Sequence, residues 1–106
     1  MEFLNKVEIK GVVGKATTQS YGDNYITNFS VVTEYCGNSA NGAIVMETTW
    51  WHCTAWDNQC PNCTEIQKGD KLHVIGRLRQ RKYIDQDNNE RVSTDVVVQS
   101  IEKIAE

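Results

Sequence analysis

Aromatic and basic side chains alternate with apolar ones in two stretches of the sequence. In METTWWHCTAW, residues 46–56, Trp50, His52 and Trp56 share one face of an extended chain, because successive side chains of a strand point to opposite faces. The stretch 71–84 carries a row of arginines in the same way. Rings on which bases stack, with cations beside them that attract phosphates, are the ingredients of a platform for single-stranded nucleic acid.

The arginine row contains Arg77, Arg79 and Arg81 and ends on the same face with Tyr83. Burial of three guanidinium groups is costly, so this face is expected to meet solvent or an anion. The alternative is a solvated strand face, on which the arginine stems simply cover apolar surface.

Charge is distributed unevenly along the chain. The whole sequence has 11 basic and 14 acidic residues and a net charge of −3, which by itself disfavours nucleic-acid binding. The segment from Lys68 to Lys82 instead has six basic residues and one acidic residue, a local charge of +5. Binding responds to the local field, so this segment can attract phosphates although the chain is acidic.

The tandem Trp50-Trp51 allows two registers for the stretch 46–56. Trp51, Cys53 and Ala55 share the second face, which is apolar and mostly small and suits the interior of a barrel. We favour Trp50 as the outward ring because it shares its face with Trp56.

The cysteines do not match a metal or redox site. Cys60-Pro61-Asn62-Cys63 is a lone CxxC, whereas a structural zinc site usually has two such pairs, or one pair with two closely spaced histidines. A thioredoxin-like motif would need a βαβ unit, and no second half of one is visible. Cys36 and Cys53 lie apart from the pair. We expect no metal and no cofactor, and an enzyme that uses these thiols remains only as an alternative.

Length and composition favour one small cytoplasmic domain. The chain has 106 residues, of which 40% are hydrophobic, enough for one core and not for two. We therefore expect a single domain over residues 1–106, which excludes a large multi-domain enzyme. No apolar stretch approaches the roughly 18–20 residues of a membrane span, and the first residues lack the pattern of a signal peptide.

The periodicity predicts an all-β protein, because alternation and β-branched runs recur while helical periodicity is nearly absent. Gly11 and Gly14 indicate a bend or bulge in the first strand. The segment 37–42 is expected to be a mobile loop, and 85–90 the tip of a hairpin. The predicted strands cover 7–13, 25–33, 46–56, 71–84 and 91–101, with one poor helical candidate at 57–67. Five strands with a short or irregular segment between the third and fourth are the layout of an OB-fold barrel with long hairpins.

The order of these motifs resembles that of the bacterial single-stranded DNA-binding proteins, which are built on an OB-fold. NFSVVT at 28–33 is similar to the second strand of that family, and TWWHCTAW at 49–56 to its aromatic third strand. KGDKLHVIGRL at 68–78 is close to a Lys-Gly, β-branched, Gly-x-Leu signature. RQRKYID at 79–85 resembles the hairpin that ends in a stacking aromatic.

The resemblance implies sequence-tolerant binding of single-stranded DNA in replication, recombination or repair, and no enzymatic activity. It implies base stacking by Trp50, Trp56 and Tyr83, with Tyr35 near another stacking position. The phosphate contacts that it implies come from Lys68, Arg79, Arg81 and Lys82, and from His52.

The resemblance also implies a homotetramer, or at least a dimer, formed partly through the first strand. Such assembly would cover Ile75 and Val97, for which one small barrel offers no clear place. The family usually continues into a flexible tail with an acidic tip, whereas this sequence ends at Glu106, so tail-mediated recruitment of replication proteins is not expected. The alternative function is an OB-fold module that binds RNA, an oligosaccharide or a protein partner, which fits the acidic total better.

Overall fold

Five long strands and one short 3₁₀ helix make up the computed structural model, which describes residues 1–105. Val, Ile, Thr and aromatic residues dominate the strands, as expected of side chains that pack on a pleated surface. The elements are β1 (Val7–Tyr21), β2 (Asn24–Asn38), β3 (Ile44–Trp56), η1 (Pro61–Glu65), β4 (Lys71–Ile84) and β5 (Glu90–Lys103). Within residues 1–105, no helix has the length and hydrophobicity needed to cross a membrane.

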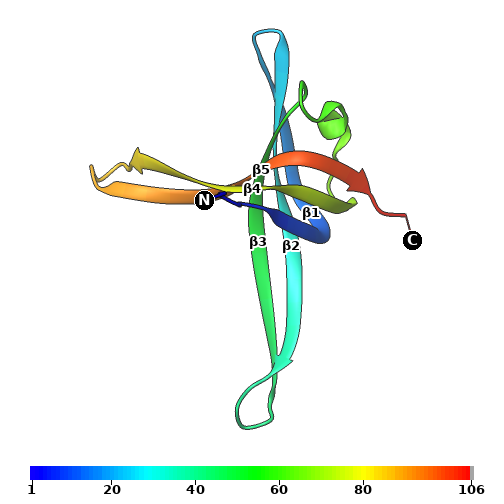
Figure 1. Cartoon of the computed structure of the whole chain (residues 1–106), viewed down its shortest axis with the longest axis vertical. Helices are drawn as coiled ribbons and strands as arrows, with labels where there is room; N and C mark the ends of the chain where they lie inside the picture. The colour runs from blue at the N-terminus through cyan, green and yellow to red at the C-terminus, as the bar shows by residue number, and fades with distance from the viewer. Residues whose placement is uncertain (106) are drawn as a thin grey trace.

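The strands close into a barrel in the order β1-β2-β3-β5-β4 (Figure 1). All neighbouring strands are antiparallel except β3 and β5, which run parallel over the pairs Cys53–Val96 and Thr54–Val97. The single turn of 3₁₀ helix lies between β3 and β4, as expected from a segment with proline and asparagines. This is the OB-fold that the sequence predicts.

The first two strands are longer than the sequence patterns predict. β1 continues to Tyr21 and β2 to Asn38, because their ends pair with each other and with β3 beyond the core. Side chains there are mostly exposed, so no apolar alternation marks the extension. The loop predicted at 37–42 is reduced to residues 39–43. The predicted irregularity in the first strand is confirmed as a shift of register between Val13 and Lys15.

Three hairpins project from the barrel (Figure 1). We call them the β1–β2, β2–β3 and β4–β5 arms, and their tips lie at residues 22–23, 39–43 and 85–89. Because of the arms, the radius of gyration is 16.1 Å, whereas a compact domain of 100 residues has about 13 Å. The arms therefore carry much of the surface away from the core.

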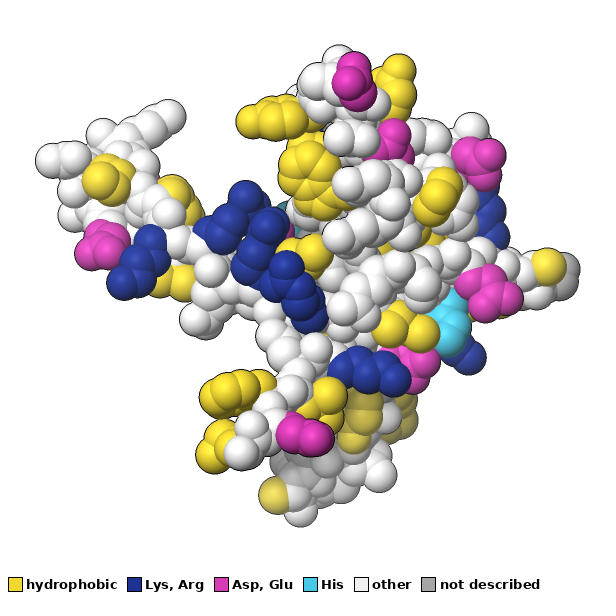
Figure 2. Space-filling model, turned by 45° about the horizontal axis from the view of Figure 1, so that its top comes forward, with side chains coloured by type: hydrophobic (Ala, Val, Ile, Leu, Met, Phe, Trp, Pro, Cys, Tyr) yellow, Lys and Arg dark blue, Asp and Glu magenta, His cyan; other side chains and the backbone are white. Residues whose placement is uncertain are grey.

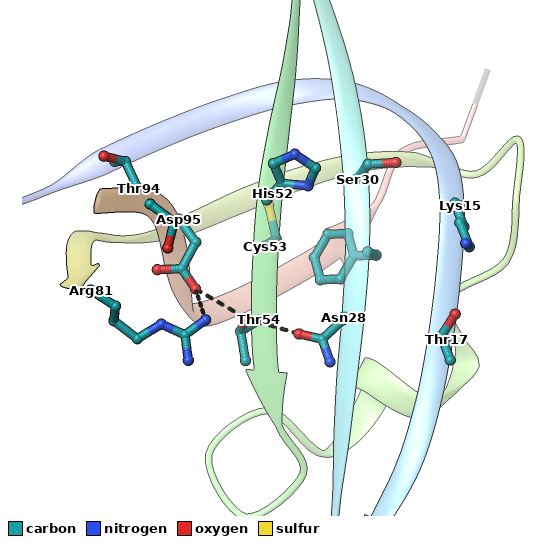
Figure 3. Close-up of a pocket in the computed structure, with 12 residues that line it drawn as sticks. Lys15, Thr17, Asn28, Ser30, His52, Cys53, Thr54, Arg81, Thr94 and Asp95 are labelled. Carbon is teal, nitrogen blue, oxygen red and sulfur yellow. Dashed lines mark hydrogen bonds and ion pairs between the residues drawn. The ribbon is translucent and has the colours of Figure 1, made fainter. Parts of the chain in front are cut away.

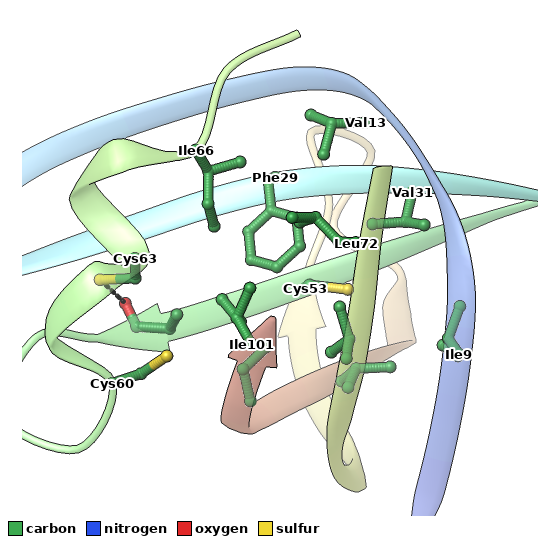
Figure 4. Packing of buried hydrophobic residues seen from close by; sticks show 14 residues of the cluster. Ile9, Val13, Phe29, Val31, Cys53, Cys60, Cys63, Ile66, Leu72 and Ile101 are labelled. Carbon is green, nitrogen blue, oxygen red and sulfur yellow. Dashed lines mark hydrogen bonds between the residues drawn. The ribbon is translucent and has the colours of Figure 1, made fainter. Parts of the chain in front are cut away.

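The core fills the barrel and extends beneath η1 (Figure 4). The expected inward face of β3 is confirmed, because Cys53 and Ala55 are buried and Trp51 packs against them. Apolar residues of all five strands and of the η1 segment contribute, among them Val13, Phe29, Val31, Ile66, Leu72, Val96 and Ile101.

Two apolar residues do not lie where the sequence pattern places them. By alternation Leu78 shares a face of β4 with the buried Leu72, yet it is exposed, because β4 loses its β1 neighbour after Gly76. Val97 is buried within the chain, between Thr54 of β3 and Arg77 of β4, and needs no partner chain to cover it.

Closure of the barrel brings backbones close together at Gly11 and Gly76. A Cβ atom at Gly76 would clash with the carbonyl group of Val97, and one at Gly11 with the carbonyl of Val32. Backbone atoms cannot move aside as the end of a side chain can, so these two glycines keep the strands in register.

We expect Gly76→Ala to lower the free energy of unfolding by about 1–3 kcal/mol or more, the cost of overpacking a tight site. Urea denaturation followed by circular dichroism measures this. Gln80→Ala, an exposed change on the same strand, should leave the free energy unchanged. Equal stability of the two variants would contradict the close approach at Gly76.

Candidate nucleic-acid interface

The outer face of β3 carries two indole rings, as the preferred register predicts. Trp50 is 53% exposed. Trp56 is half-buried and meets the ring of Tyr21 edge to face, with ring centroids 6.0 Å apart. Trp51 points to the other side, where its Nε1–H donates a hydrogen bond of 2.9 Å to the hydroxyl of Thr33. Trp50 therefore presents the most accessible indole surface.

Two further rings lie on separate arms. Tyr83 is exposed on the β4–β5 arm, and Tyr35 is exposed on the β2–β3 arm opposite Glu47. The four rings named from the sequence thus come from the barrel and two of its projections, so a ligand that touched all of them would have to span several elements.

Basic side chains gather at the root of the β4–β5 arm, beside hydrophobic ones (Figure 2). Arg77 and Arg81 are exposed there, and Arg79 is only partly exposed. Lys82 is exposed nearer the tip of the arm, where its Nζ lies 3.9 Å from a carboxylate oxygen of Glu90. Lys68 is exposed in the turn before β4. The cations predicted from the sequence are therefore accessible, with Arg79 the least so.

Asp95 forms a bidentate ion pair with Arg79. The guanidinium donates from Nε to one carboxylate oxygen at 3.1 Å and from Nη2 to the other at 2.8 Å. Arg81 approaches the same carboxylate at 3.4 Å, and the hydroxyl of Thr54 lies 3.2 Å from it. Asp95 is buried, and its hydrogen bonds from Arg79 hold the pKa of the carboxyl below its usual value.

The hydrogen bond with Asp95 in turn raises the pKa of Arg79, so the guanidinium stays protonated. Its positive charge is largely balanced by the carboxylate of Asp95. Sequence reasoning missed Asp95. The sequence signal for this ion pair was an acidic residue next to the valines of STDVVV, on the strand that pairs with the arginine row. In the structure Asp95 lies directly opposite Arg79.

A groove of about 470 Å³ lies on the outer face of β1, β2 and β3, beside the β4–β5 arm (Figure 3). Its lining brings His52 and Arg81 together with Lys15 of β1 and Ser30 of β2. Lys15 also lines a second hollow with Lys68. Lys68, Lys15, His52 and Arg81 thus form a row of basic side chains across the barrel. Sequence reasoning missed Lys15, because the first strand was expected to end at Val13.

Thr54 alternates with His52 and Trp56 on the outer face of β3, yet it is buried. The reason is its position between Asp95 and the side-chain oxygen of Asn28, to which its hydroxyl is 3.1 Å away. His52 on the same face stays exposed.

The buried thiols belong to the core. Burial raises the pKa of the Cys53 thiol to about 12 and also raises that of Cys60. Protonated, buried thiols are poor nucleophiles, because the thiolate is the reactive form. Among residues 1–105, no three His, Cys, Asp or Glu side chains are grouped so that they could hold a metal ion.

An OB-fold barrel with exposed rings and a cationic groove on its outer face is typical of oligonucleotide-binding proteins. The profile of the Single-strand binding protein family matches residues 4–104 of the chain. The protein therefore belongs to this family, whose members are DNA-binding proteins and not enzymes.

Known relatives agree with this assignment. The chain is 32% identical over 107 residues to the single-stranded DNA-binding protein of Bacteroides thetaiotaomicron, covering 96% of this chain and 66% of that protein. It is 31% identical to the one from Neisseria meningitidis serogroup B, covering 95% and 60%. The chain thus spans about two thirds or less of these relatives. The fold matches the structure of a Plasmodium falciparum SSB complex with ssDNA, with a TM-score of 0.89, 20% identity and coverage of 99% and 98%.

We expect Asp95→Asn to lower the free energy of unfolding by about 1–3 kcal/mol at pH 7, because Arg79 loses its charged acceptor. The folded-state pKa of Asp95 is depressed, so its contribution is present above about pH 4 and is lost as the pH falls through the folded pKa. The gap between wild type and variant should therefore close in acid.

Urea denaturation between neutral and acidic pH measures this gap. Asp23→Asn in the exposed β1–β2 turn is the matched control and should follow the wild type. A stability difference that stayed constant with pH would show that the charge of Asp95 is not responsible.

Proposed function

We propose that the protein binds single-stranded DNA with little sequence preference and so protects it during replication, recombination or repair. The main support is the exposed indole of Trp50 beside a groove lined by Lys15, His52 and Arg81. A ring stacks with any base, and cations attract the backbone of any sequence. The Plasmodium relative, whose structure is an SSB complex with ssDNA, supports the same ligand.

In this proposal the bases stack on Trp50, Trp56 and Tyr83, and on Tyr35 where the strand follows the β2–β3 arm. The phosphates contact basic side chains along the groove and the arm, namely Lys15, His52, Lys68, Arg77, Arg81 and Lys82. Arg79 contributes less than the sequence predicts, because Asp95 already neutralises it.

We also propose that the chain acts as a homo-oligomer, a tetramer or a dimer, in the cytoplasm. Apolar side chains around the start of β1 support assembly, since Phe3, Leu4 and Val12 are exposed. Ile75, on the neighbouring strand β4, is only partly covered. Burial of these side chains between copies would remove their apolar surface from water.

Titration of tryptophan fluorescence separates this function from the alternative of another OB-fold ligand. Oligo-dT should quench the emission strongly, whereas duplex DNA and a neutral oligosaccharide should not. Stronger quenching by an RNA of the same length, or by the oligosaccharide, would favour the alternative.

Trp50→Ala and Trp56→Ala should each weaken binding of oligo-dT by about 1–3 kcal/mol, the contribution of one stacked base. The effect of Trp56→Ala should be the smaller, because Trp56 is half-buried. Fluorescence anisotropy of a labelled oligonucleotide measures both losses without relying on the tryptophans.

Trp51→Ala is the control for the register. It should lower the free energy of unfolding by about 3 kcal/mol, because the ring packs against the core, and change affinity little. Loss of binding by a fully folded Trp51→Ala protein would show that the register is wrong by one residue.

The double change Arg81→Gln, Lys82→Gln should make binding less sensitive to salt. The slope of log K against log salt is about −0.7 per neutralised phosphate for single strands, so loss of two contacts should reduce it by about 1.4. Arg79→Gln should change the slope less, because Asp95 pairs with Arg79. Anisotropy titrations over a range of NaCl concentrations measure the slopes. An unchanged slope in the double variant would exclude a path across these residues.

A further inference from the structure

Trp50 lies across the outer face of the sheet and ends against Gly14. Its side chain starts on β3, and β2 separates β3 from β1. A Cβ atom at Gly14 of β1 would nevertheless lie 2.7 Å from Cη2 of the indole, and closer still to Cζ3. Carbon atoms pack at about 3.5–4.0 Å. The indole therefore occupies the space that any other side chain at position 14 would need.

Tyr35 lies against a glycine in a similar way. Residues 35 and 37 share a face of β2, and a Cβ atom at Gly37 would lie 2.7 Å from Cε1 of the tyrosine ring and 3.0 Å from its hydroxyl oxygen. The phenol ring thus covers bare backbone on the β2–β3 arm, while the residue as a whole stays exposed.

The backbone itself does not require glycine at either position. The glycines with φ in the left-handed region are Gly22, Gly42 and Gly69, and neither Gly14 nor Gly37 is among them. The atoms that a new methyl group would meet lie at the far ends of Trp50 and Tyr35, and not in the backbone as at Gly76. Alanine at 14 or 37 should therefore displace a ring and leave the barrel intact.

We infer that Gly14 and Gly37 are positioning residues for base stacking. Because neither has a side chain, the ring of Trp50 can rest on the backbone at Gly14, and the ring of Tyr35 on the backbone at Gly37. The inference deepens the proposed function and rests on it. A ring whose far end rests on a strand is held in one orientation, and its exposed surface stays available to a base. A ring oriented before binding loses less freedom when the base arrives, so affinity depends on the glycine although the glycine need not touch the ligand.

The test is a double-mutant cycle on oligo-dT affinity with wild type, Gly14→Ala, Trp50→Ala and the double variant. Trp50→Ala should weaken binding by about 5- to 150-fold, and Gly14→Ala by a comparable or smaller factor. The double variant should bind no more weakly than Trp50→Ala, because alanine at 14 acts through the ring. Wild-type affinity in Gly14→Ala, or multiplied losses in the double variant, would overturn the inference.

The same cycle with Gly37→Ala and Tyr35→Ala tests the second ring on a different element. Cys36→Ala is the matched control, because residue 36 lies between the two on the opposite face of β2 and should keep wild-type affinity. A loss in Cys36→Ala as large as in Gly37→Ala would point to a general effect on the arm and would overturn the role of Gly37.

A measurement without DNA separates this inference from the proposed function. Acrylamide quenching of tryptophan emission should increase in Gly14→Ala over wild type, and the same substitution should have no effect in the Trp50→Ala background. If wild type failed to bind oligo-dT, the proposed function would fail while the quenching would still show whether Gly14 orients Trp50. Unchanged quenching, or a Gly14→Ala protein that did not fold, would overturn the assignment of Gly14.

Discussion

The barrel is closed by a short parallel contact between β3 and β5, and the rest of the structure depends on it. Only two residue pairs join these strands, Cys53–Val96 and Thr54–Val97. Asp95, one residue earlier on β5, adds side-chain contacts to Thr54 on β3 and to Arg79 on β4. One buried carboxylate thus ties three strands together where the barrel closes, and it does so at the edge of the groove in which phosphates are proposed to lie.

This arrangement reconciles an acidic chain with the anionic ligand that we propose. The net charge of −3 is a sum over the whole chain, whereas the groove gathers Lys15, His52 and Arg81, and Lys82 is exposed farther along the β4–β5 arm. Asp95 removes part of that positive charge but fixes the direction of two arginines. Cations that are already oriented have less freedom to lose when a phosphate arrives. The interface therefore combines moderate charge with ordered geometry.

The sequence could predict those parts of the fold in which buried and exposed side chains alternate strictly along a strand. The first half of β4 was predictable because core and solvent faces alternate from Lys71 to Gly76, and the outward position of Trp50 follows from its spacing to Trp56. The ends of β1 and β2 lie beyond the core, where both faces are polar and periodicity is lost. Lys15 was missed for that reason. Asp95 was missed because its partners come from other strands, and one sequence does not show pairing across a closed barrel.

The distribution of the thiols allows a thiol-reactive reagent to label the β2–β3 arm at Cys36. Cys53, Cys60 and Cys63 are buried, and Cys36 alone among the four cysteines is exposed. A maleimide dye added to the native protein would therefore attach beside Tyr35, on the opposite face of its strand, while the core thiols stay shielded until the barrel opens. The native sequence thus offers one reporter position on the arm and three internal reporters of unfolding, without any engineered cysteine.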